Sequence, residues 1–137
     1  MLHIEVNLVA VLVAGVAAFV LGWLWYSPLL FMKPWLHSRG LDPASMAGMK
    51  MPVGKMAGEL LRCLVLAFFV AHIVGEYSPK TWMAAAHFGI FLWVTFPVLI
   101  YWGTALWENH SWKTVAIDAG DWLVKLLAVT LILFFMK

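Results

Sequence analysis

Charged residues are scarce in this 137-residue chain, where Asp, Glu, Lys and Arg together make up 12% of the sequence. A soluble domain carries about 25% charged residues, so a chain that is 64% hydrophobic cannot cover its own surface for water. A lipid bilayer fits this composition, and the length allows four helices of about 20 apolar residues. We therefore predict an all-α integral membrane protein: one domain over residues 1–137, built as a bundle of four transmembrane helices.

Cysteine and catalytic motifs are also nearly absent. Cys63 is the only cysteine, which excludes an intrachain disulfide, and it lies in an apolar run where a small buried residue is expected. The net charge of +2 is too small to indicate a nucleic-acid partner. No phosphate-binding Gly-rich loop, HExxH, CxxC or Gly-x-Ser-x-Gly pattern occurs. We therefore expect no enzymatic activity and no cofactor.

What the sequence does contain is four long apolar runs, which predict helices over residues 4–26, 57–75, 82–107 and 114–136. Pro97 lies inside the third run and should kink that helix or free a backbone carbonyl. The runs leave little sequence outside the membrane apart from the first connection.

The first connection, residues 29–56, stands out by its charge and its methionines. It carries four Lys or Arg residues against one acid, Asp42, together with several Met, Phe and Trp residues. Asp42 followed by Pro43 is typical of a helix start, with Asp42 as the cap. This composition predicts either an interfacial segment lying on the membrane or a loop folded over the helix ends.

Small residues recur at every fourth position of the first run, at Ala10, Ala14, Ala18 and Gly22. Such a ridge lets another helix approach closely. Four helices leave limited room for a pore within one chain, and the ridge can equally serve a contact between subunits. We therefore expect a homo-oligomer.

Lysine and arginine are distributed unevenly between the two sides of the membrane. The first connection together with Arg62 holds five of them and the third connection adds Lys113, whereas the opposite side holds only Lys80 and Lys137. The positive-inside rule then predicts a multi-pass protein of the cell inner (cytoplasmic) membrane with both termini outside the cytoplasm.

The charges of the fourth run are the strongest functional signal. Asp118, Asp121 and Lys125 lie on one helix face, because positions i, i+3 and i+7 return to the same side. Each would be costly against lipid, so we expect these side chains to face protein or water. Glu59 and Arg62 open the parallel second helix at a matching depth. We therefore expect Arg62 to pair with the two aspartates in a buried charged cluster.

This cluster supports two functional hypotheses. In the first, the protein transports a cation or proton through a charged site at its cytoplasmic end, at Asp118, helped by Asp121, Tyr26 and Arg62. In the second, it is a structural or accessory membrane protein whose charges only lock the bundle. The partners expected are the lipid bilayer and further copies of the chain, with a small ion or small molecule as ligand under the first hypothesis.

A third hypothesis rests on histidines at the opposite end of the predicted bundle. His72 and Glu76 are spaced i, i+4, which suits shared metal ligation if the helix continues through Gly75. His3 and His87 can reach the same surface. The sequence therefore also allows a metal-binding membrane protein.

Two stretches resemble signatures of a known family. The first contains Gly22, Trp25, Tyr26 and Pro28 and continues to Phe31 and Trp35, and the second is Ile117-Asp118-Ala119-Gly120. Both resemble the small bacterial membrane family catalogued as domain of unknown function 1761, and the match spans essentially the whole chain. The resemblance implies a four-helix membrane protein without a named activity. It directs attention to the residues of both signatures, and it favours Asp118 over Asp121 as the residue with a role common to the family.

Overall fold

All regular structure in the described part of the chain is helical. A computed structural model describes residues 5–42 and 52–136. Its separate helices are α1 (Leu8–Trp25), α2 (Met32–Ser38), α4 (Val53–Tyr77) and α7 (Trp112–Phe135). A further continuous helix consists of α5 (Trp82–Trp93), the π-helical segment η1 (Val94–Val98) and α6 (Leu99–Trp107). The predicted all-α class is therefore confirmed.

Three of these helices are long and apolar enough to cross a membrane: Leu8–Trp25, Val53–Tyr77 and Trp82–Trp107. The 24-residue helix α7 has the length but not the composition, because it carries Asp118, Asp121 and Lys125 in its middle. A membrane location is therefore plausible from three spans.

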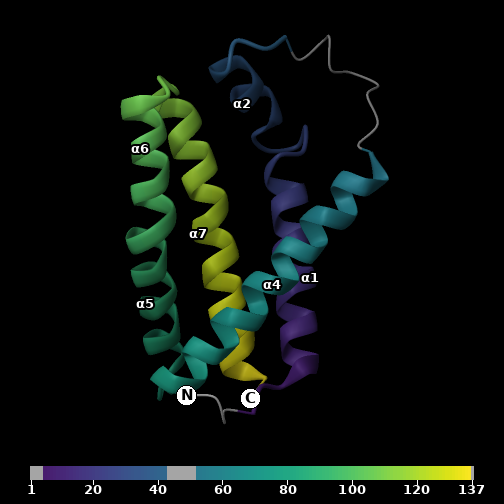
Figure 1. Ribbon diagram of the computed structural model, residues 1–137, viewed down its shortest axis with the longest axis vertical. Helices are drawn as coiled ribbons and strands as arrows, with labels where there is room; N and C mark the ends of the chain where they lie inside the picture. The colour runs from purple at the N-terminus through teal and green to yellow at the C-terminus, as the bar shows by residue number, and fades with distance from the viewer. Residues whose placement is uncertain (1–4, 43–51, 137) are drawn as a thin grey trace.

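Helix α7 occupies the middle of the bundle (Figure 1). It packs against α1 on one side and against α5 on the other, while α4 packs mainly on α1 and crosses the bundle diagonally. The side chain of Asn7 donates a 2.7 Å hydrogen bond to the carbonyl of Met136, which joins the start of α1 to the end of α7. Both α4 and α7 run toward this end of the bundle. This agrees with the parallel arrangement predicted for the second and fourth runs.

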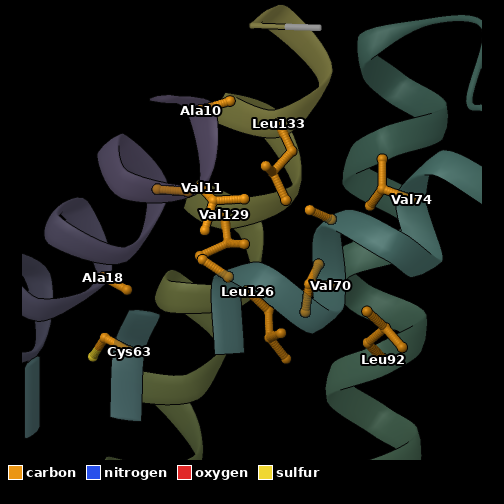
Figure 2. Packing of buried hydrophobic residues seen from close by; sticks show 13 residues of the cluster. Ala10, Val11, Ala18, Cys63, Val70, Val74, Leu92, Leu126, Val129 and Leu133 are labelled. Carbon is orange, nitrogen blue, oxygen red and sulfur yellow. The ribbon is translucent and has the colours of Figure 1, made fainter. Parts of the chain in front are cut away.

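The small-residue ridge of α1 forms the tightest part of the core. Ala10, Ala14 and Ala18 are at most 1% exposed and face α4 and α7. Figure 2 shows their neighbours converging on the completely buried Val129 of α7. The ridge therefore packs closely against both helices.

Polar side chains set where several helices begin. The side chain of Asn7 accepts hydrogen bonds from two backbone N–H groups of the first turn, so α1 begins at Leu8 rather than at residue 4. Thr81 and Ser111 cap α5 and α7 in the same way. Helix α4 extends beyond its predicted bounds of 57–75 at both ends and stops at Ser78, whose φ of 48° is left-handed.

Pro97 distorts the third long helix, as its position in the sequence predicts. It lies inside η1, where the backbone widens into a π-helical turn between α5 and α6. A proline has no N–H to donate and its ring crowds the preceding turn, so the helix accommodates it by a local change of hydrogen-bond spacing.

The described part of the first connection is folded back onto the bundle. Helix α2 packs against the start of α7, and Ser38 at its end lies 2.6 Å from the hydroxyl of Thr114. The helix start predicted at Asp42 and Pro43 falls largely outside the described residues. An interfacial position for residues 29–56 stays a prediction.

Candidate functional site

Three of the four charged residues of α7 are withdrawn from the surface, and only Lys113 in the first turn is exposed. Asp118, Asp121 and Lys125 are 8%, 3% and 2% exposed, although each sits in a helix of mostly apolar residues. Their common face turns toward α1 and α4, as their spacing predicts. Burial at this level requires a partner for every charge, and each of the three has one.

One buried ammonium group is shared by two carboxylates. Lys125 Nζ lies 3.0 Å from Oδ2 of Asp121, one turn earlier on α7, and 3.5 Å from Oε1 of Glu59 on α4. The same Glu59 oxygen accepts a 2.8 Å bond from Nη2 of Arg62. We call Glu59, Arg62, Asp121 and Lys125 the charged cluster. Its formal charges cancel, with two acids against two bases.

The expected pairing of Arg62 with the aspartates is wrong. Its ion pair is with Glu59 on its own helix, and its side chain is 59% exposed rather than buried. Lys125 neutralises Asp121 instead. The reason is the diagonal course of α4, which carries its N-terminal turns away from α7 (Figure 1). Arg62 therefore reaches Trp122 of α7, with its guanidinium 5.6 Å from the ring centroid, but makes its ion pair one turn back along α4.

Gly22 makes room for the buried lysine. A Cβ at this position would lie 2.7 Å from Lys125 Cε and 2.9 Å from Nζ, closer than real Cβ contacts allow. The last member of the small-residue ridge therefore serves the charged cluster directly. Any larger residue would push the ammonium group away from Asp121.

Asp118 makes a separate set of contacts. Its Oδ1 atom accepts hydrogen bonds from the hydroxyl of Tyr26 at 2.6 Å and from Nε1 of Trp35 at 3.0 Å. The two donor rings meet edge to face with centroids 5.4 Å apart. Burial raises the pKa of Tyr26 above its usual value, and the hydrogen bond to Asp118 and that carboxylate's charge raise it further. Tyr26 is therefore held as a neutral donor.

The ring of Trp25 packs on Gly120, the glycine of the second signature. Trp25 donates from Nε1 to the carbonyl of Ile117 at 2.9 Å, which lays its ring across α7 at Gly120. A Cβ on Gly120 would lie 2.7 Å from Trp25 Cζ2. Phe31 also packs on Trp25, with the two ring centroids 4.4 Å apart. The two signature stretches are thus brought together.

A cavity of about 560 Å³ opens beside the charged cluster. All four members of the cluster line it, together with Lys55 and the first-signature residues Gly22, Tyr26, Pro28 and Trp35. Tyr101 and Trp122 form its far wall, joined by a 3.0 Å hydrogen bond from the indole to the phenol. We call this the charged cavity. The cavity therefore combines the charged cluster with apolar lining from residues such as Phe19, Met32 and Met56.

Asp118 does not line the charged cavity, although its two donors do. From outside the cavity, Asp118 therefore holds the side chains of Tyr26 and Trp35 in place through its two hydrogen bonds. Lys55 and Tyr101 line the cavity but carry no signal in the sequence that would have placed them there. Tyr101 in particular is one aromatic residue in a long uncharged run, and only the packing of α6 against α7 shows its position.

The histidines at the other end do not assemble into a metal centre within the described residues. No group of three His, Cys, Asp or Glu side chains there can hold a metal ion. His72 instead packs edge to face on Phe68, with centroids 4.8 Å apart, on a helix that does continue through Gly75 to Glu76. His3 lies outside the described residues, and His87 is exposed on α5. The metal site therefore stays a prediction.

Comparison with known proteins gives one match. A family model described as "Protein of unknown function (DUF1761)" matches residues 9–134, which is nearly the whole chain. No curated protein and no solved structure matches.

Proposed function

The chain belongs to the family described as Protein of unknown function (DUF1761), and from the charged cavity we propose a four-span membrane protein that carries a proton or small cation. Helix α7 would be the fourth span. Its 24 residues correspond to about 36 Å, more than a hydrocarbon core of about 30 Å. Its charges are buried against α1 and α4, which removes the main objection to a lipid-embedded position.

The observation that carries the proposal is the sharing of Lys125 between two acids. Its Nζ atom is 3.0 Å from Asp121 and 3.5 Å from Glu59, so a short side-chain movement strengthens one pair and weakens the other. The carboxylate that loses the ammonium group can accept a proton or a small cation from the cavity. Arg62 can leave Glu59 at low cost, because its side chain is 59% exposed.

The cavity supports entry from one side only. The uneven distribution of Lys and Arg in the sequence supports a cytoplasmic position for this end of the bundle. Beyond Lys125, helix α7 presents the buried residues Leu126, Val129 and Leu133 to α1 and α4. Translocation therefore requires this packed region to open, which is the behaviour of a carrier with slow turnover rather than of an open channel.

Ion flux into proteoliposomes tests the proposal. Vesicles with a trapped pH-sensitive dye and an imposed potassium diffusion potential report proton entry, and a sodium-sensitive dye reports the alternative ion. Ion flux into vesicles that contain the wild type should exceed flux into protein-free vesicles, and Asp121→Asn should abolish this excess flux while the protein stays folded. Glu108→Gln, at a carboxylate that is 64% exposed in the α6–α7 loop, is the matched control and should keep full flux. Wild-type vesicles that behave like empty ones for both ions would refute the proposal.

A second candidate function is supported by Asp118. Its carboxylate is buried and engaged by Tyr26 and Trp35 outside the cavity, which suits a structural role in fixing α2 against α7. Under this candidate the protein is an accessory membrane component, and Asp118 affects assembly rather than flux.

A further inference from the structure

A second cavity adjoins the charged one. It has a volume of about 410 Å³ and lies between α4 and the helix formed by α5, η1 and α6. We call it the apolar cleft. Tyr101 and Trp122 line both cavities, so the hydrogen-bonded pair of rings forms the boundary between them. The remaining lining of the cleft is hydrophobic.

The rings of Tyr77 and Phe88 stack with centroids 4.7 Å apart, one turn of α4 beyond the cleft-lining residue Ile73, which joins the end of α4 to the start of α5. From there α4 follows its diagonal course across the bundle (Figure 1). Pro97 and the π-helical turn line the cleft from the opposite wall.

Several side chains that line the cleft are also exposed on the outer surface of the bundle. Phe69 on α4 is 59% exposed, and Phe96 and Ile100 on the opposite wall are 57% and 62% exposed. In a membrane these side chains meet acyl chains. From Val65 to Ile73, the cleft follows α4 over nine residues, a rise of about 12 Å, close to the half-thickness of about 15 Å of a hydrocarbon core.

Basic groups lie on α4 just before the residues that line the cleft. Arg62 is one turn before Val65 on α4, and its side chain is 59% exposed. Lys55 lies two turns further toward the start of the helix and is also exposed. With Lys125, the charged cavity has three bases against the two acids Glu59 and Asp121, an excess of one positive charge. A guanidinium matches the geometry of a phosphate group, and basic residues at this depth attract anionic lipids.

We propose that an anionic phospholipid of the cytoplasmic leaflet occupies both cavities, with its phosphate on Arg62 and Lys55 and one acyl chain in the apolar cleft. The inference rests on the membrane-spanning arrangement proposed above, because that arrangement places Arg62 near the headgroups and Phe69 among the chains. A phosphate on Arg62 competes with Glu59 for the guanidinium. A bound lipid therefore turns Glu59 toward Lys125 and weakens the pair between Lys125 and Asp121.

Native mass spectrometry of the detergent-purified full chain tests this site. The wild type is mixed with phosphatidylglycerol or with phosphatidylcholine of the same acyl chains, and the retained lipid is counted. The wild type should retain phosphatidylglycerol preferentially. Arg62→Gln should lower that retention about fivefold, since a basic residue near a membrane surface contributes about 1 kcal/mol. Arg62→Lys should recover part of it, and Lys113→Gln, at an exposed lysine outside both cavities, should retain lipid as the wild type does.

Tryptophan substitutions on α4 test the acyl-chain part. Val65→Trp fills the cleft and should reduce retention of both lipids, whereas Leu61→Trp, at a residue 62% exposed outside the cleft, should not. Thermal unfolding of each variant excludes loss of fold as the cause. Equal retention of the two lipids by the wild type, or unchanged phosphatidylglycerol binding by Arg62→Gln, would overturn the proposal.

Two further outcomes separate this site from its alternatives. If the wild type forms a dimer that retains no lipid, and Val65→Trp dissociates this dimer, the occupant of the cleft is a second copy of the chain. That result would also overturn the lipid proposal. Lipid retention without ion flux would refute the transport function alone. Ion flux without lipid preference would refute the lipid site alone.

Discussion

The hydroxyl of Tyr26 donates a 2.6 Å hydrogen bond to Oδ1 of Asp118, across 92 positions of sequence. The same oxygen accepts from Trp35, so the end of α1 and the middle of α2 are both held by one carboxylate of α7. The donors belong to the first signature stretch and the acceptor to the second. The signatures therefore describe one packed contact, which builds a wall of the charged cavity.

Asp118→Asn should lower stability more than function. Asparagine keeps an acceptor oxygen but removes the negative charge, so the bonds from Tyr26 and Trp35 change from charge-assisted to neutral. We expect the free energy of unfolding to fall by about 1–2 kcal/mol, measured by thermal unfolding in detergent. Flux per folded protein should stay near the wild-type value. Loss of flux at unchanged stability would instead make Asp118 an ion site.

Tyr26→Phe should change the alkaline limb of the stability profile. The pKa of Tyr26 is raised in the folded protein by burial and by the carboxylate of Asp118, so folding favours the protonated phenol. Its contribution to stability is complete below the unfolded pKa of about 10 and declines as pH rises above that value. Unfolding measured between neutral pH and pH 11 should show a steeper loss for wild type than for Tyr26→Phe. Parallel curves would contradict the raised pKa.

Gly120→Ala should destabilise the protein, whereas Gly103→Ala should not. The new Cβ at Gly120 would lie 2.7 Å from the Trp25 ring, which must move and weaken its bond to Ile117. Such overpacking costs about 1–3 kcal/mol. A Cβ at Gly103 meets nothing within 4 Å, and alanine in a helix interior is favoured by up to about 1 kcal/mol. The two melting temperatures should therefore shift in opposite directions. Equal shifts would show that the ring does not rest on Gly120.

Lys125→Met should be the most damaging of the single changes. It leaves Asp121 buried without its ammonium partner and removes one of the two bases beside Glu59. Breaking a buried pair in this way costs about 3–5 kcal/mol. The double variant Lys125→Met with Asp121→Asn removes both charges and should recover much of the loss in thermal unfolding. Additive effects of the two changes would mean that Lys125 and Asp121 do not interact.

The sequence predicted the helices and the burial of the α7 charges well, because both depend on local pattern. Long uncharged runs determine α1 and the Trp82–Trp107 helix, and the spacing of Asp118, Asp121 and Lys125 determines a common face. The helix distortion at Pro97 follows from covalent structure alone.

The partner of Arg62 could not be predicted in the same way. Matching depth on two parallel helices brings Arg62 close to the aspartates only if those helices stay in contact. Helix α4 instead contacts α1 closely at Gly15, where a Cβ would lie 3.0 Å from Cα of Leu64, and diverges from α7 toward its start. The crossing angle depends on side-chain shapes at that contact, which one sequence does not reveal. The position of Tyr101 could not be predicted either, because it depends on how α6 packs against α7.

The position of Lys125 between two carboxylates is the claim on which the functional account depends, and magnetic resonance tests it directly. Solid-state NMR of the protein in lipid bilayers, with ¹⁵N at lysine and ¹³C at carboxyl groups, measures through-space coupling from Lys125 Nζ to its neighbours. Asp121→Asn and Glu59→Gln samples assign the two carbons. Our account predicts coupling to Asp121 and, more weakly, to Glu59, in keeping with distances of 3.0 and 3.5 Å to their oxygens. A lysine that couples to neither carboxyl carbon and exchanges its protons freely with water would contradict it.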